Sequence, residues 1–246
     1  MLAAALWLAS PAFFVTPAGA ADLTVLSGNG PKAAIAELAA RFERATGHTV
    51  SIHFEVNPAV RKRIEAGDAF DVAVLNPPVL DALIAQGLVA AGTRAVFGRS
   101  GIGMAVRAGA FKPDISSVEG FKRTLLNATS VAYPGEGASG KYFESVVDRL
   151  GITAQMKAKM RPMPAETTVE VVARGEIELV VVVASRIAGV AGVDFAGPIP
   201  PALQTWIGFA AGVASNARAP EAARTLVQYL AAPANVPVLG ALGVEP

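Results

Sequence analysis

The residues of this chain that could do chemistry lie mainly in short turns rich in glycine, asparagine, serine and arginine. Glycine lets the backbone approach a ligand closely, and free N–H groups at the start of a helix favour negative charge. An arginine guanidinium can bind a carboxylate through two parallel hydrogen bonds. These residue types predict a site for a small anion. The candidate ligand-binding residues are Ser27, Gly28, Asn29, Gly30, Asn57, Arg61, Asn76, Ala138, Ser139, Gly140, Tyr142, Ser185 and Arg186.

Several of these side chains have an ordinary alternative role. Arg61 lies four residues after Asn57, on the same face of a predicted helix. With its two basic neighbours it could equally form a solvated face. Asn76 follows a strand, so it could cap the next helix, bind ligand or do both. Lys141 and Tyr142 could point inward or pack outside the site.

Acid–base chemistry has few candidates. Glu136 is the only acid in the glycine-rich loop Pro134–Gly140, and Lys141 follows that loop. Either could transfer a proton, although a solvated loop acid is the more ordinary role of Glu136. The sequence has no cysteine and only two histidines, His48 and His53. These counts exclude thiolate chemistry and argue against a multi-histidine metal centre, so we expect no metal and no cofactor.

The composition is that of a globular chain. Of its 246 residues, 52% are hydrophobic and 17% are charged, so the chain can bury a core. Its formal net charge of +1 argues against a nucleic-acid partner, which would need a basic surplus on one face. A small anion needs only a few local donors, so the charge does not oppose anion binding.

The N-terminal segment predicts a signal peptide over residues 1–20. The first 21 residues carry no charged side chain, Leu2–Val15 is apolar, and Ala18-Gly19-Ala20 has the small residues that a signal peptidase reads. The apolar run is too short to span a bilayer, and a buried helix is the alternative. No later stretch reaches membrane-spanning length. We therefore expect a periplasmic mature protein without membrane insertion.

Three strand–turn–helix units open the predicted mature chain. Their strands are Asp22–Leu26, Val50–Val56 and Phe70–Leu75, each followed by a polar turn and a helix. This succession predicts parallel βαβ winding. With right-handed crossovers, all three turns lie at the carboxyl edge of one sheet, where open α/β sheets bind ligands.

The chain then enters a second α/β region and returns. The pattern predicts two short strands, Val96–Phe97 and Ile102–Val106, and helices at Lys141–Leu150 and around Ala154–Met160. The apolar run Leu179–Val183 predicts a central strand buried on both faces. We expect a first lobe from residues 21–97 and 203–246 and a second lobe from residues 98–202. Two crossing segments would then form a hinge beside a cleft.

A family resemblance covers essentially the whole mature chain. The chain resembles bacterial extracellular solute-binding proteins related to the periplasmic molybdate-binding protein in Arg41–Val89, Gly101–Leu126, Val131–Phe143 (VAYPGEGASGKYF) and Val172–Ser185. The opening strand and the Ser27–Gly30 turn show the same resemblance. The resemblance implies an α/β fold of the periplasmic binding protein type (class II), with two lobes joined by two crossing segments. It also implies delivery of a solute to an ABC permease, and we expect a monomer.

The chain departs from the molybdate-binding pattern at two places. In those relatives, two serines after the first two strands and a tyrosine in the second lobe hold the oxyanion. Here the second turn carries Asn57-Pro58, and Val183 matches the tyrosine position. The departures favour an organic carboxylate over molybdate or tungstate.

Three functions remain open. The first is capture of a small anion for an ABC importer. The second is isomerisation of aconitate, because the segments Val60–Gly67 and Ala105–Ser117 resemble a subgroup that includes aconitate isomerases. The third is a ligand-free interaction module, which the glycine-rich turns disfavour.

Overall fold

The computed structural model describes residues 19–246, so the predicted signal peptide lies almost entirely outside the described residues. The strands are β1 (Asp22–Gly28), β2 (Thr49–Glu55), β3 (Val72–Leu75), β4 (Ala95–Arg107), β5 (Val131–Pro134), β6 (Met160–Met163), β7 (Leu179–Val183), β8 (Val193–Pro198) and β9 (Trp206–Val213). The α-helices are α1 (Lys32–Thr46), α2 (Asn57–Glu65), α3 (Pro77–Ala85), α4 (Val118–Asn127), α5 (Ala138–Arg149), α6 (Thr153–Met156), α7 (Glu170–Ala173), α8 (Ala184–Ile187), α9 (Pro220–Leu230) and α10 (Val236–Ala241).

The first part of the sheet has the predicted parallel winding. Strand β1 pairs in parallel with both β2 and β3, and β3 pairs with the antiparallel β9. Helices α1, α2 and α3 follow these three parallel strands in turn. The turns after β1, β2 and β3 therefore meet at one edge of the sheet, as the sequence predicts.

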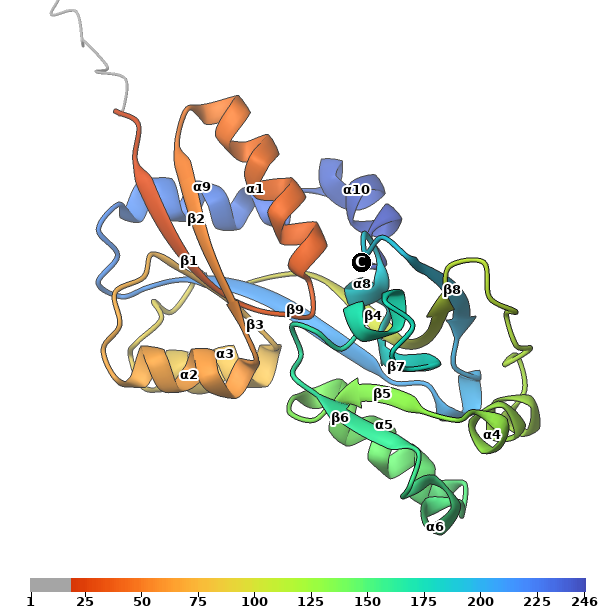
Figure 1. The fold of residues 1–246 in the computed structure, drawn as a ribbon. Coiled ribbons are helices and arrows are strands. Elements are labelled where there is room, and N and C mark those ends of the chain that lie inside the picture. Colours follow the sequence, from red (N-terminus) through yellow and green to blue (C-terminus); the bar gives the residue numbers. More distant parts are fainter. Residues whose placement is uncertain (1–18) are drawn as a thin grey trace, which may run out of the picture.

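Strand β4 connects the two parts of the sheet (Figure 1). Its first half, Ala95–Gly101, pairs with β9, and its second half, Ile102–Val106, pairs with β7. Strand β8 also pairs with the second half, while β5 lies between β6 and β7 in parallel. Strand β4 thus exchanges β9 for β7 as its partner between Gly101 and Ile102. This point lies close to the expected lobe boundary between residues 97 and 98, and the boundary itself stays a prediction.

Three sequence predictions differ from the structure. The two short strands around Gly98–Gly101 are one continuous 13-residue strand, β4, because its glycines pair with β9 instead of ending the strand. The helix predicted around Ala154–Met160 ends in the structure with α6, at Met156. The prediction was wrong for the residues after it, because Met160 begins β6. Helix α5 begins at Ala138 rather than Lys141, which places Ala138 and Ser139 in its first turn.

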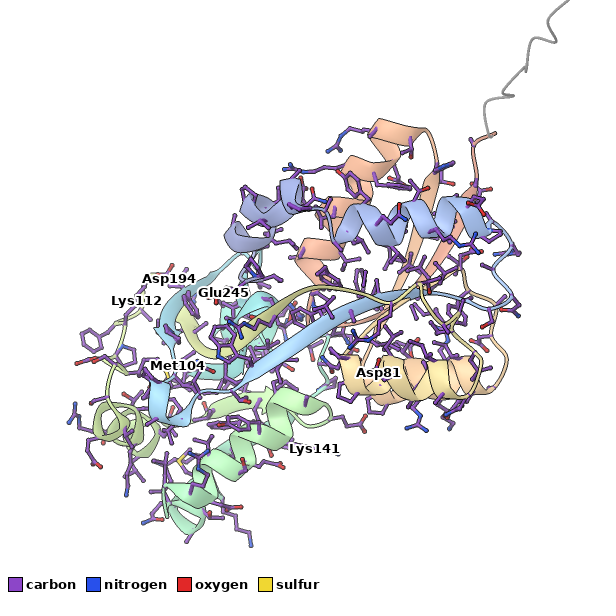
Figure 2. The ribbon with its side chains drawn as sticks, turned by 180° about the vertical axis from the view of Figure 1, so that it is seen from behind. Asp81, Met104, Lys112, Lys141, Asp194 and Glu245 are labelled. Atoms are coloured by element: carbon purple, nitrogen blue, oxygen red, sulfur yellow. The ribbon has the colours of Figure 1, made fainter. Side chains whose placement is uncertain are left out.

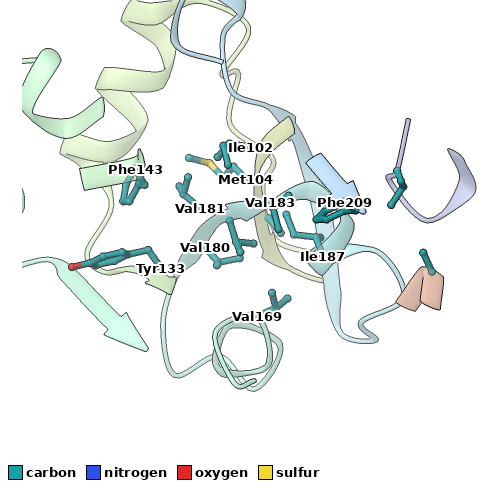
Figure 3. Close-up of a cluster of buried hydrophobic side chains, with 14 of the residues drawn as sticks. Ile102, Met104, Tyr133, Phe143, Val169, Val180, Val181, Val183, Ile187 and Phe209 are labelled. Atoms are coloured by element: carbon teal, nitrogen blue, oxygen red, sulfur yellow. The ribbon is translucent and has the colours of Figure 1, made fainter. Parts of the chain in front are cut away.

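The core joins both parts of the sheet around β7. All five residues of β7 are buried, as the apolar run predicts for a central strand. Figure 3 shows Val183, at the end of β7, beside Ile187 and Phe209 in this cluster. The Phe209 ring stacks on Phe97 with 6.0 Å between ring centroids. This packing fixes the end of β7 that faces the site described below.

Within residues 19–246, no helix is long and apolar enough to cross a bilayer.

Candidate functional site

A cleft lies where the turns of the two parts of the sheet face each other. About 480 Å³ of space free of protein atoms lies within it, and this space includes open solvent at its mouth. Its polar lining comes from β1–α1, β2–α2, β3–α3, the β5–α5 loop and α8. The lining residues are Asn29, Gly30, Val56, Asn57, Asn76, Pro134, Glu136, Gly137, Ala138, Ser139, Ala165, Val182, Val183, Arg186, Ile207 and Phe209.

The wall formed by the first three turns is held by an asparagine network. Asn57 Oδ1 accepts a hydrogen bond from the backbone N–H of Asn76 (2.9 Å), and Asn76 Nδ2 donates to the carbonyl oxygen of Gly208 (2.8 Å). Proline occupies the first turn of both α2 and α3, so each helix start offers fewer free N–H groups. This wall is therefore structured mainly by contacts among its own residues.

The start of α5 contributes backbone donors to the opposite wall. Gly137 has φ 105°, a conformation that favours glycine, and it leads into Ala138 and Ser139. No side chain caps this helix, so its first N–H groups are free to meet an anion in the cleft. Ser139 is buried and lies on the cleft lining.

Arg186 is the arginine of the cleft lining. It is 5% exposed, and its Nη2 donates to the carbonyl oxygen of Glu166 (2.8 Å) and to Glu170 Oε1 (2.7 Å). Its Nε is buried and has no hydrogen-bond partner among residues 19–246. The guanidinium is thus anchored through one nitrogen and keeps another donor unpaired, which suits a carboxylate ligand.

Asn29 joins the two walls. Its Nδ2 donates to Glu166 Oε1 (2.9 Å), although 137 residues separate the two in sequence. Asn29 Oδ1 is buried without a partner in the described part of the chain. Ser185 makes a second cross-contact, because its Oγ donates to the carbonyl oxygen of Gly30 (2.8 Å).

Some candidate residues lie outside the cleft lining because they have other partners. Arg61 forms an ion pair with Glu65 (2.8 Å) on the exposed side of α2, and this guanidinium lowers the pKa of Glu65. Tyr142 donates from its hydroxyl to the carbonyl oxygen of Leu203 (2.8 Å). Lys141 is exposed at the start of α5 (Figure 2).

The remaining candidates serve the packing behind the cleft. Ser27 is fully buried and donates to the carbonyl oxygen of Gly28 (3.0 Å). A Cβ on Gly28 would lie 3.0 Å from Asn57 Nδ2, and one on Gly140 would lie 1.7 Å from the Pro134 carbonyl oxygen. Both glycines are thus explained by close internal packing.

Glu166 and Glu170 take part in the site but are absent from the candidates named by sequence. Both lie in or after the irregular Pro164–Val169 segment, which has no periodic pattern to follow. The spacing of Glu166 and Glu170, one helical turn apart, was the available signal.

Burial is the main control on the pKa of Tyr133, which lies behind the cleft. Burial, followed by the hydrogen bond from the Tyr133 hydroxyl to Glu144 (2.9 Å), raises the pKa of Tyr133 to about 12. Tyr133 therefore stays neutral beside Pro134 on the cleft lining. Across residues 19–246, no group of three or more His, Asp or Glu side chains is placed to hold a metal ion.

Comparison with known protein families identifies the family of this chain. A family model described as "Bacterial extracellular solute-binding protein" matches residues 23–245. The chain belongs to this family. An aconitate isomerase from Pseudomonas sp. is 38% identical over 230 residues, a match that covers 91% of this chain and 87% of the relative.

Solved structures of solute-binding proteins share the fold. The periplasmic molybdate-binding protein of Azotobacter vinelandii superposes with a TM-score of 0.77 at 20% identity, covering 91% of this chain and 99% of that one. The sulfate-binding protein SubI of Mycobacterium tuberculosis superposes with a TM-score of 0.71 at 15% identity, covering 92% and 87%. These likenesses confirm the predicted two-lobed α/β fold.

Proposed function

We propose that this solute-binding protein captures a small organic carboxylate in its cleft for an ABC permease. The observation that carries the proposal is Arg186, a buried arginine of the cleft lining whose Nε has no acceptor among residues 19–246. A buried donor without a partner costs about 1–3 kcal/mol. A bound carboxylate oxygen would remove this cost through a charge-assisted hydrogen bond.

The donor arrangement supports a carboxylate over a tetrahedral metal oxyanion. An oxyanion with four equivalent oxygens needs donors on several sides, and the positions that resemble the second serine and the tyrosine of the molybdate-binding relatives hold Asn57 and Val183 here. Pro58 and Pro77 further reduce the backbone donors of the first wall. The donors that remain cluster on the second wall, where a planar carboxylate meets a planar guanidinium.

We propose export and lobe closure as part of this function. Residues 1–20 would be removed during export, and lobes 21–97 with 203–246 and 98–202 would close on the ligand in a monomeric periplasmic protein. N-terminal sequencing of the protein recovered from the periplasm should begin at Ala21. Recovery of the uncleaved chain from the cytoplasm would contradict export.

Thermal unfolding with a panel of anions tests the proposal. Ligand stabilises the folded state as RT ln(1 + [L]/Kd), so citrate, malate or an aconitate isomer should raise Tm more than molybdate, tungstate or sulfate. Arg186→Ala should abolish the shift, and Arg61→Ala, which alters an arginine outside the cleft lining, should retain it. Absence of a shift with every carboxylate would refute the proposal.

A second candidate function is isomerisation of aconitate on the same fold. The 38% identical aconitate isomerase from Pseudomonas sp. favours it. Migration of the double bond requires a base to remove a proton from one carbon and return a proton to another. Glu136 lines the cleft, whereas Lys141 does not, which supports Glu136 as the acid–base residue of this proposal.

Proton NMR of trans-aconitate in D₂O tests this second function. An isomerase would form cis-aconitate and incorporate deuterium, and Glu136→Gln should slow both processes by about 100-fold or more, the usual contribution of a general base. Glu37→Gln, on the exposed side of α1 and paired with Arg41, is the matched control. An unchanged spectrum with the wild-type protein would exclude the isomerase.

A further inference from the structure

Asn29, a residue of the cleft lining, has an unpaired acceptor. The residue follows β1, is 5% exposed and lies on the cleft lining. Its Oδ1 is buried and accepts no hydrogen bond from residues 19–246. A buried acceptor of this kind favours a ligand that brings a donor.

The orientation of the Asn29 amide is fixed by its neighbour. Glu166 Oε1 receives the hydrogen bond from Asn29 Nδ2 (2.9 Å). An ionised carboxylate can only accept hydrogen bonds, so the amide nitrogen must face Glu166. The oxygen of the amide is therefore the atom left for the ligand.

The residues that carry the unpaired donor and the unpaired acceptor are both hydrogen-bonded to Glu166. Arg186 Nη2 donates to the backbone oxygen of the same Glu166 (2.8 Å) whose side chain holds Asn29. Arg186 Nε and Asn29 Oδ1 are thus both unpaired atoms of residues bonded to Glu166. Both residues line the cleft.

The charges around the cleft limit the charge of the ligand. Arg186 is paired with Glu170, Glu136 lines the cleft, and Glu166 lines a second pocket that shares Glu136 with it. These acids would repel a further anionic group at this point. A ligand that offers a hydroxyl at this point would instead be stabilised by them.

We propose that the preferred ligand is a hydroxycarboxylate, with its carboxylate on Arg186 and its hydroxyl donating to Asn29 Oδ1. This inference rests on the proposed carboxylate binding. Glu166 acts as a positioning residue, because its carboxylate fixes which end of the Asn29 amide meets the ligand.

Calorimetric titration with matched ligand pairs tests the inference. Citrate and tricarballylate differ only by the hydroxyl, as do malate and succinate. The wild-type protein should bind the hydroxylated member of each pair at least about tenfold more tightly, because its analogue leaves Oδ1 unpaired. Glu166→Gln should bring the ratio of the two affinities in each pair close to one. Glutamine can accept or donate a hydrogen bond, so it would let the Asn29 side-chain amide adopt either orientation. Arg61→Ala should keep the wild-type preference.

The outcomes separate the inference from the function on which it rests. Equal affinities within each pair, or tighter binding of tricarballylate or trans-aconitate than of citrate, would overturn the hydroxyl contact and leave carboxylate binding intact. An unchanged preference in Glu166→Gln would overturn the positioning role of Glu166. Absence of binding by all these acids would overturn carboxylate binding itself.

Discussion

Asn57 and Asn76, on the wall built from the first turns, hydrogen-bond to each other and to Gly208, whereas Arg186 on the opposite wall keeps Nε unpaired. Both walls lie at the ends of strands in one α/β fold. The difference indicates that the first wall sets the shape of the cleft and the second wall binds the charge. In this account, substitution of Arg186 affects affinity most, and substitution of Asn57 or Asn76 affects stability.

The largest effect is expected from Arg186→Lys. Lysine keeps the charge and can still pair with Glu170, but it lacks the planar pair of donors. Carboxylate affinity should fall by about 100-fold, because a hydrogen bond to a charged group contributes about 1.5–3 kcal/mol. Isothermal titration calorimetry measures the loss, and Arg61→Lys is the matched control. An affinity within the error of wild type would place the ligand elsewhere.

A stability effect should result from Asn57→Ala. The substitution leaves the N–H of the half-buried Asn76 without its acceptor, which should cost about 1 kcal/mol, the lower end for a buried unpaired donor. Urea unfolding should show this loss, whereas Asn127→Ala at the exposed end of α4 should not. A larger loss of affinity than Arg186→Lys produces would reverse the assignment of roles to the two walls.

Tyr133, which lies behind the second wall, makes the stability of the folded protein depend on pH. Its pKa is raised to about 12 in the folded protein, above the ordinary value of about 10 in the unfolded chain. Its contribution to stability is therefore complete below pH 10 and is lost as pH rises through about 12. Tyr133→Phe should lose less stability over that interval than wild type in thermal unfolding. Equal losses would contradict the raised pKa.

The smallest effect is expected from Arg61→Ala. Its ion pair with Glu65 is solvent-exposed, and such pairs contribute little. Ligand affinity should stay within about twofold of wild type, since screened surface charges act weakly. A loss comparable to that of Arg186→Lys would show that α2 turns its basic face to the ligand.

The sequence predicted the repeated strand–helix units because local periodicity encodes them. The strand at Leu179–Val183 was predicted with its observed bounds. Arg61 and Arg186 were harder to separate, since both follow a strand by a few residues. Glu65, four residues after Arg61, was the local signal for a surface ion pair.

The contacts of Glu166 could not be predicted in the same way. Its bond to Asn29 spans 137 residues and depends on how the two walls face each other. No local pattern specifies that contact, because Glu166 lies in an irregular segment. Long-range polar contacts of this kind are decided by tertiary packing.

The NMR signal of the Arg186 Nε–H group tests the central claim most directly. In a ¹⁵N-labelled protein, the signal is identified by its absence in Arg186→Lys. Addition of malate should shift it strongly as the Nε–H begins to donate to a carboxylate oxygen. Saturation of the protein with malate while this signal stays in place would contradict the binding of the carboxylate by Arg186.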